Sequence, residues 1–344
     1  MVHRQSTLAQ GGTCLSDTTQ IALVGCGYWG KNLCRNFHAL GALSLVVDAT
    51  KNGQTTARSI APDIQVTDSL DEVLRNDQIL GISLATPAET HADLAIKAMY
   101  AGKDVFVEKP MALTIEDAEK MKHIAEETGR ILMVGHLLEY HPAIIKLHEL
   151  ITTGELGKIH YIYSNRLNFG KVRTEENALW SFAPHDIALI LRLIGQAPVE
   201  VSACGGSYLT KGIADTTVSN LRFDNDSRAH IFVSWLHPFK EQRLVVVGDK
   251  NMAIFNDVAP FGEKLKLYTQ NVEFDGPIPI LKKDDTEFVE HANTEPLREE
   301  CNHFLDCIQS RKLPLTNAQS GIDVLKVLHA CQQSIEQNGG PVLL

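Results

Sequence analysis

The 344-residue chain has the composition of a globular protein, with 44% hydrophobic and 22% charged residues. Its length is enough for two domains of ordinary size. Asp and Glu number 42 against 32 Lys and Arg, which gives a net charge of -10. Such a chain repels a phosphate backbone as a whole, so we expect no nucleic acid among its partners.

Cysteine usage and the lack of long apolar runs indicate the compartment. The seven cysteines are odd in number and scattered, with no CxxC pair and no Cys/His cluster at metal-ligand spacing. We interpret them as buried thiols of a reducing cytosol, and we expect no metal site. No stretch resembles a signal-peptide core or a membrane span. We therefore expect a cytoplasmic protein without membrane contact, whose polar residues 1–19 form a flexible leader.

Apolar runs and helical stretches alternate over residues 20–139. The expected strands are IALV, LSLVVD, ILGISLAT, DVFVE and ILMVG, and the expected helices cover residues 30–39, 70–74, 89–101 and 115–128. Strict alternation predicts a parallel sheet with crossover helices. The strands are continuously apolar, as expected when helices cover both faces of the sheet. We predict an α/β nucleotide-type domain over these residues.

After residue 139 the pattern changes to consecutive strands. A strand is expected at 158–169, followed by VEVSACGGSYL, TTVSNLRF, AHIFVSWL, RLVVVGD, NMAIFND and KLKLYT, and helices at 142–152, 185–193, 296–309 and 319–337. Strands separated by turn residues predict a mostly antiparallel, open sheet. We predict a C-terminal α+β domain for substrate and oligomer contacts over residues 140–344.

A glycine-rich turn follows the first strand directly. GCGYWG, from Gly25 to Gly30, stands between the strand IALV and a helix. Gly25 permits the tight turn, Gly27 lets the backbone approach a pyrophosphate, and Gly30 allows close helix packing. The helix N-terminus then faces the anion. We predict a Rossmann domain with the three glycines, Tyr28 and Trp29 at a dinucleotide; the alternative is a purely structural turn.

Asp48 indicates which dinucleotide is bound. It ends the second strand, 23 residues after Gly25, where a carboxylate can accept hydrogen bonds from the ribose hydroxyls. The same carboxylate would repel a 2′-phosphate, and Ala49 and Thr50 supply no Arg to receive one. We therefore predict NAD rather than NADP, although Lys51 is a basic residue nearby.

Polar residues end the next two strands at the same sheet edge. Thr86-Pro87 closes the strand ILGISLAT and His91 opens the following helix; we predict cofactor contacts there, with helix capping as the alternative. The next strand, DVFVE, ends in Glu108-Lys109-Pro110, where Pro110 keeps Lys109 extended so that it can point into the crevice. We assign Glu108 to the cofactor site. By position alone, a lysine here is more often a solvated surface residue than a catalytic one.

Four segments together resemble one family. The strand–GCGYWG–helix unit, ATPAETHADLAIKAMYAGKDVFVEKPMALT, VGHLLEYHPA and EPLREECNHFLDCI are similar to the Gfo/Idh/MocA oxidoreductases, and the similarity covers nearly everything after residue 20. The resemblance implies that Lys109 lies beside the nicotinamide and the substrate hydroxyl. It also implies that His185, in WSFAPHDIALILRLIG, completes the catalytic site.

We expect His185 to begin an apolar helix just after Pro184. A histidine of near-neutral pKa is suited to taking the hydroxyl proton as hydride leaves the same carbon. The Lys109 ammonium could stabilise the developing alkoxide charge. Which of the two is formally the base stays open.

One position departs from the family pattern. Many members have an aspartate four residues before the histidine, and Ser181 stands there in this chain. Asp186 is adjacent to the histidine in sequence but lies about 100° away around the helix. We therefore do not expect Asp186 to replace the missing carboxylate.

The substrate is suggested by HYIYSNRLNFGKVRTEENALWSF and GCGYWGKN. Both resemble the branch that oxidises C3 of UDP-N-acetylglucosamine or of its uronic acid, before transamination of the 3-keto sugar. Arg166 and Asn168 share one face of a strand, and Lys171 and Arg173 follow it. We predict that these four bind a diphosphate or sugar hydroxyls. The alternative is a solvated loop paired with the acidic residues that follow.

The alternatives in function are a dehydrogenase of a free sugar or polyol such as an inositol, and a non-catalytic dinucleotide-binding regulator. The resemblance further implies a homodimer or homotetramer with second-domain sheets paired face to face. The apolar strand face from Tyr161 to Phe169 would suit such pairing, or packing against the domain's own helices.

Overall fold

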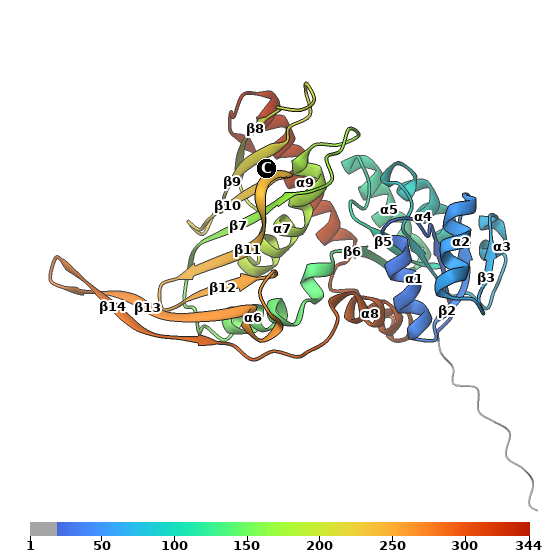
Figure 1. Cartoon of the computed structure of the whole chain (residues 1–344), viewed down its shortest axis with the longest axis horizontal. Helices are drawn as coiled ribbons and strands as arrows, with labels where there is room; N and C mark the ends of the chain where they lie inside the picture. Colours follow the sequence, from blue (N-terminus) through green and yellow to red (C-terminus); the bar gives the residue numbers. More distant parts are fainter. Residues whose placement is uncertain (1–18) are drawn as a thin grey trace, which may run out of the picture.

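The structure is a computed structural model that describes residues 19–344, without the side chains of residues 270–271 and 283–285. Residues 1–18 of the predicted leader lie outside the described residues. The chain forms two units side by side, each built on its own sheet (Figure 1).

The first sheet has six parallel strands in the order β3-β2-β1-β4-β5-β6. The strands are β1 Ile21–Val24, β2 Leu43–Val47, β3 Gln65–Thr67, β4 Gly81–Leu84, β5 Asp104–Glu108 and β6 Leu132–Gly135. All residues of β1, β4, β5 and β6 are buried, as their continuously apolar sequences predicted. The predicted Rossmann domain is confirmed.

Five helices accompany this sheet: α1 Gly30–Ala39, α2 Lys51–Ile60, α3 Leu70–Leu74, α4 His91–Tyr100, preceded by the turn η1 Ala88–Thr90, and α5 Ile115–Thr128. The sequence reading missed α2 and β3. Helix α2 buries only Gly53 and Ala57, so it has almost no apolar periodicity to detect. It begins instead at a local cap, the Thr50 side chain, which accepts a hydrogen bond from the Gly53 amide.

The second sheet has nine strands in the order β14-β13-β12-β11-β7-β10-β9-β8-β15. Their bounds are β7 Ile159–Phe169, β8 Glu200–Gly206, β9 Thr216–Arg222, β10 Arg228–Ser234, β11 Leu236–Gly248, β12 Met252–Asn256, β13 Leu265–Asp275, β14 Ile278–Phe288 and β15 Val342–Leu343. Among the described strand pairs of this second sheet, only that of β7 with β10 is parallel. The prediction of a mostly antiparallel sheet is confirmed.

Helices cover one face of the second sheet. These are α6 Pro142–Thr152, α7 Ala178–Ile194 and α9 Ala318–Glu336, and their apolar residues share one core with the inward-facing residues of the strands. The short turns η2 Leu137–Tyr140 and η3 Phe261–Glu263 complete the chain's connections. The other face of this sheet carries no helix among the described residues.

Helix α7 starts earlier than the sequence reading predicted. Asn177 caps it by accepting a hydrogen bond from the Trp180 amide, so Pro184 and His185 lie inside the helix. A proline removes one amide donor from a helix interior. Here the cap and the full burial of Ala178, Leu179 and Ala183 outweigh that loss.

The chain returns to the first unit near its end. Helix α8, Pro296–Ser310, lies beside α1 (Figure 1), and its Phe304 packs edge-on against Phe37 and Phe106, with ring centroids 6.5 and 5.8 Å apart. Helix α9 then contributes Ile322 to the core beneath β6 and Leu328 to the core of the second unit. Both helices had been placed in the second domain from the sequence; the structure uses them to join the two units.

The structure bears on two expectations from the sequence, the burial of the cysteines and the lack of membrane spans. Five of the six cysteines described are buried, whereas Cys204 on β8 is exposed, which corrects the prediction for that residue. None of the helices within residues 19–344 is long and apolar enough to cross a membrane.

The packing of α8 generates a stability prediction. Phe304→Ala removes a fully buried ring from the contact between α8 and the first sheet, so we expect a loss of about 3–5 kcal/mol in the free energy of unfolding. Urea denaturation followed by circular dichroism measures it. Leu313→Ala, at a side chain that is 80% exposed, is the control with a change below about 0.5 kcal/mol. A loss below about 1 kcal/mol for Phe304→Ala would contradict this account.

Candidate active site

The three glycines of the turn between β1 and α1 have different physical roles. Gly25 has a φ of 91°, and a Cβ on it would stand 2.8 Å from the Ala85 carbonyl oxygen. A Cβ on Gly30 would stand 2.0 Å from the carbonyl oxygen of Gly25. A Cβ on Gly27 would meet no atom within 4 Å. The fold therefore requires the first and third glycines, whereas the second leaves its backbone open to a ligand.

Asp48 connects this turn to the next helix. Its Oδ2 accepts a hydrogen bond from the Cys26 amide at 2.7 Å, and its Oδ1 accepts from the Thr50 amide at 2.8 Å and hydroxyl at 2.7 Å. Gly53 leaves room for the carboxylate, since a Cβ there would lie 2.0 Å from Oδ2. Asp48 is thus held rigidly at the carboxyl edge of β2, where the sequence predicted a ribose contact.

Trp29 connects the turn to the end of β5. Its indole Nε1 donates to Glu108 Oε1 at 2.5 Å, and the Lys109 amide donates to Glu108 Oε2 at 3.3 Å. Burial raises the pKa of Glu108 to about 7, against the lowering effects of Trp29 and Lys109. Trp29 and Glu108, both predicted as cofactor contacts, are therefore bonded to each other, and this bond fixes Glu108 directly before Lys109.

His91 fixes the neighbouring strand ends. Its ring is buried, with Nδ1 2.9 Å from the Pro110 carbonyl oxygen and Nε2 2.9 Å from that of Thr86. The ring therefore bridges the segments that follow β4 and β5. The Thr86-Pro87 segment follows β4 closely, and the Thr86 hydroxyl pairs with that of Thr90 at 2.7 Å.

Lys109 reaches across to the second unit. Its Nζ donates to the main-chain carbonyl of Ser181 at 3.3 Å, one helical turn before His185 on α7. Burial lowers the pKa of Lys109, with Glu108 acting in the opposite direction. The structure thus brings the two predicted catalytic residues together from separate domains. At the position of the family aspartate, this chain offers a carbonyl oxygen to the lysine.

His185 is held in its neutral form. The residue is partly exposed, while its Nδ1 is buried without a hydrogen-bond partner among residues 19–344. Burial first, and then the positive charges of Lys109 and Arg166, hold the pKa of His185 well below its usual value. A neutral imidazole beside an ammonium can accept a proton from a hydroxyl placed between them.

Asp186 faces away from His185, as its offset around the helix predicted. Its carboxylate accepts from Arg166 Nε at 2.8 Å and Nη2 at 3.0 Å, and from the Ser164 hydroxyl at 2.6 Å. The bidentate pair joins β7 to α7 in a buried position. Arg166 was predicted to bind substrate. In the structure its ion pair with Asp186 positions α7, the helix that carries His185.

The other predicted substrate residues lie where β7 ends. Arg173 pairs with Glu176 at 3.1 Å and with Glu175 at 3.6 Å, as the alternative interpretation of a paired loop expected. Lys171 is exposed and Asn168 half-buried. Glu176 and Arg173 both act on the pKa of Lys109, Glu176 raising it and Arg173 lowering it, so this loop borders the crevice.

The sequence reading missed two buried groups of this region. His136 follows β6 and has both ring nitrogens buried without a partner in the described chain; burial and then Lys109 hold its pKa at about 4. Its place at the carboxyl end of a strand was a usable signal. Glu300 on α8 also has both oxygens buried and unpartnered, and burial followed by Glu108 raises its pKa. No sequence motif distinguishes it from a surface glutamate.

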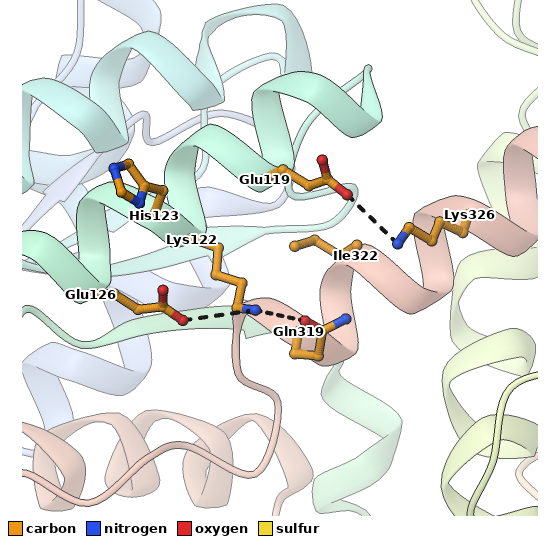
Figure 2. Close-up of a pocket in the computed structure, with 7 residues that line it drawn as sticks. All are labelled: Glu119, Lys122, His123, Glu126, Gln319, Ile322 and Lys326. Carbon is orange, nitrogen blue, oxygen red and sulfur yellow. Dashed lines mark hydrogen bonds and ion pairs between the residues drawn. The ribbon is translucent and has the colours of Figure 1, made fainter.

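A groove of about 200 Å³ lies elsewhere, between α5 and α9 (Figure 2). Its charges are paired, since Lys122 contacts Glu126 at 3.7 Å and Lys326 contacts Glu119 at 3.6 Å. Lys122 also donates to Gln319 at 2.9 Å. These contacts explain the groove as a solvated helix–helix surface, distinct from the crevice at Lys109.

Comparison with known proteins agrees with this geometry. The sequence profile described as an oxidoreductase family with an NAD-binding Rossmann fold matches residues 19–136, and the profile of the GFO/IDH/MocA C-terminal domain matches residues 144–254. The chain belongs to the Gfo/Idh/MocA oxidoreductase family. Its first unit is accordingly an NAD(P)-binding Rossmann domain.

Individual relatives are distant and chemically diverse. The chain is 29% identical to 2,7-anhydro-N-acetylneuraminate hydratase of Mediterraneibacter gnavus, over 73% of this chain and 70% of that protein. It is 26% identical to UDP-N-acetylglucosamine 3-dehydrogenase of Acidithiobacillus ferrooxidans, over 91% and 96%, and 27% identical to scyllo-inositol 2-dehydrogenase of Bacillus subtilis, over 79% and 80%. A solved structure of the Acidithiobacillus enzyme superposes with a TM-score of 0.80, covering 92% of this chain and 97% of that one.

The open position at Gly27 generates a test of cofactor binding. Gly27→Ala adds a methyl group that contacts nothing in the folded chain but lies where a pyrophosphate would approach. We expect an unchanged melting temperature and at least a tenfold loss of NAD affinity, measured by calorimetric titration.

Gly30→Ala is the matched comparison, because its Cβ would collide with the Gly25 carbonyl; we expect both stability and affinity to fall. If Gly27→Ala bound NAD as tightly as the unchanged protein, the turn would be structural only.

The charge beside His185 generates a second prediction. Lys109→Met removes the ammonium that lowers the pKa of His185, so we expect that pKa to rise toward the ordinary value of 6.5. NMR titration of histidine Cε1 signals measures the change, with His185→Asn to assign the resonance. In the unchanged protein the acidic limb of kcat/KM should then lie below pH 6.5. An unmoved resonance in Lys109→Met would refute the coupling.

Proposed function

We propose that this protein oxidises a ring hydroxyl of a sugar with NAD, and that the substrate is a UDP-N-acetylglucosamine-type nucleotide sugar oxidised at C3. The product would be the 3-keto sugar, ready for transamination. The proposal rests on the hydrogen bond from Lys109 Nζ to the Ser181 carbonyl. This bond joins the end of β5, which lies beside the glycine turn, to α7, the helix that carries His185.

The residues of the crevice fit a dehydrogenation. NAD, when bound, supplies the acceptor for the hydride that leaves the hydroxyl-bearing carbon. His185 is neutral and takes the hydroxyl proton, so the C–H and O–H bonds both break as the C=O bond forms. Lys109 donates a hydrogen bond to that oxygen and stabilises its developing negative charge. We assign the base to His185, because its pKa lies well below its usual value while Lys109 starts from a much higher one.

Asp48 supports NAD rather than NADP as the proposed cofactor. Three hydrogen bonds hold its carboxylate at the ribose end of the predicted cofactor site, where a 2′-phosphate would meet a fixed negative charge. Thr86, Pro87 and the exposed Tyr28 complete the proposed contacts along the cofactor.

The substrate class rests on similarity and on the end of β7. The chain covers nearly the whole Acidithiobacillus 3-dehydrogenase, and Asn168, Lys171 and Arg173 place polar groups at the crevice border. The specific argument for a free sugar or polyol is the pairing of Arg173 with two glutamates, which neutralises a cation that a diphosphate would need; a relative also acts on an inositol. A non-catalytic regulator is disfavoured, because it gives no reason for Lys109 and His185 to meet.

We also propose that the working form is a homodimer or homotetramer. The apolar face of β7 that includes Tyr161 is turned away from α7 and remains 40% exposed at that residue. Exposed apolar faces of this extent are typical of subunit interfaces.

The decisive experiment follows reduced nicotinamide by absorbance. The purified protein is mixed with NAD or NADP and with UDP-N-acetylglucosamine, its uronic acid, free N-acetylglucosamine or an inositol, with a 2-oxo acid present to recycle retained cofactor. We expect turnover with NAD and a UDP-sugar. Lys109→Ala and His185→Ala should each lower kcat by about 10²–10⁴-fold.

Lys122→Ala, in the groove between α5 and α9, is the control with unchanged kcat. Turnover of inositol or free sugar alone would replace the nucleotide-sugar proposal with the polyol one. Tight NAD binding without turnover of any of these compounds would favour a regulator.

A further inference from the structure

A small cavity lies between the two units, next to the two catalytic candidates. It offers about 10 Å³, which is room for roughly one water molecule. Its lining includes Pro110, which follows Lys109, and Pro184, which precedes His185. The side chain of His136 also lines it, and the other lining residues are apolar or glycine. His136 is therefore the polar side chain that faces this cavity.

The backbone holds His136 in place directly after β6. Its amide donates to the Val134 carbonyl at 2.8 Å, and its carbonyl accepts from the Glu139 amide at 2.9 Å. The residue is 2% exposed, and neither ring nitrogen has a partner in the described part of the chain. An imidazole buried without a hydrogen bond is costly. The fixed ring is thus available to a polar group on the other side of the cavity.

The two ring nitrogens of His185 differ in their surroundings. Nδ1 is buried and unpartnered within residues 19–344, whereas the residue as a whole is partly exposed. Nε2 is therefore the nitrogen that can meet a substrate hydroxyl in the crevice. For Nε2 to accept a proton, the neutral ring must carry its hydrogen on Nδ1. That buried N–H needs an acceptor.

The surroundings of His185 offer one acceptor. Burial lowers the pKa of this ring most, and three side chains follow in order: Lys109, Arg166 and His136. An ammonium and a guanidinium only donate hydrogen bonds, whereas a neutral imidazole has a free lone pair. Burial and then Lys109 hold the pKa of His136 at about 4, so its ring is neutral at physiological pH. The carboxylate of Asp186 is engaged by Arg166 instead.

We propose that His136 positions the catalytic base: it accepts a hydrogen bond from Nδ1–H of His185, directly or through one water molecule in the cavity. This bond keeps the hydrogen on Nδ1 and leaves the Nε2 lone pair directed at the crevice. His136 acts through His185 and touches neither substrate nor cofactor. The inference rests on the proposed function, in which His185 is the base, but it does not depend on which sugar is oxidised.

The test is the tautomer of His185 in the full-length protein without substrate. It is read from the ¹⁵N shifts of the ring at about pH 8, where an ordinary histidine is neutral, with His185→Asn to assign the signals. We expect the hydrogen on Nδ1 in the unchanged protein. His136→Leu and His136→Phe offer no acceptor and should shift the ring to the Nε2–H form. His136→Gln keeps an acceptor and should retain the Nδ1–H form.

Turnover separates positioning from a purely structural role. His136→Leu should lower kcat at least tenfold, with less than about a twofold change in KM and in the dissociation constant of NAD. His136→Gln should recover most of kcat. Val324→Ala is the matched control, because Val324 is a buried apolar residue of the same cavity. It should lower the melting temperature without shifting the tautomer of His185.

An unchanged tautomer in both His136→Leu and His136→Phe would overturn the inference. An Nε2–H form in the unchanged protein would also overturn it. Equal losses of kcat in His136→Leu and His136→Gln, with lowered melting temperatures, would make His136 a structural residue only. A lack of turnover with every sugar would count against the proposed function alone, because the tautomer is measured without substrate.

Discussion

The site depends on one constraint. Ionisable side chains in the crevice between the two units are buried away from water. Glu108, Lys109, His136 and His185 all have pKa values displaced in the direction that disfavours their charged forms. The displacement of each has burial as its largest cause. Because the groups lie close together, the charge of Lys109 then adds to the effect of burial on the two histidines. The crevice thus disfavours the charged forms of His136 and His185 beside the amino group of Lys109.

This arrangement requires the two units to be held firmly together, and the chain achieves it by crossing between them more than once. Helix α8 returns to pack on α1 and β5, and α9 contributes to the cores of both units. Arg166 and Asp186 fix α7 on its own sheet, while Lys109 contacts that helix from the other unit. A displacement of α7 would separate the two catalytic candidates, so the ion pair and the helix packing serve the chemistry indirectly.

The second sheet contributes in two ways because its two faces differ. Its inward face supports α6, α7 and α9, and with them His185. Its outward face retains exposed apolar residues, such as Tyr161 at 40% exposure. The face that supports His185 and the face that we propose for subunit contact are therefore opposite sides of one sheet.

The sequence by itself determined the features that depend on local or periodic signals. The alternation of apolar strands and helices predicted the parallel sheet, GCGYWG predicted the turn, and turn residues predicted the antiparallel sheet. Lys109 and His185 were found through resemblance to a family, since each residue alone is ambiguous. The start of α7 was misplaced because Pro184 looks like a helix start, although the Asn177 cap lies earlier.

Only the tertiary structure decided which distant residues meet. The bonds of Trp29 to Glu108, of Lys109 to the Ser181 carbonyl and of Asp186 to Arg166 join residues 79, 72 and 20 positions apart, and no local pattern encodes such pairs. His136 and Glu300 became apparent only through their burial without partners. The physical reason is that desolvation and charge coupling depend on three-dimensional neighbours, whereas helix and strand periodicity depends on neighbours along the chain.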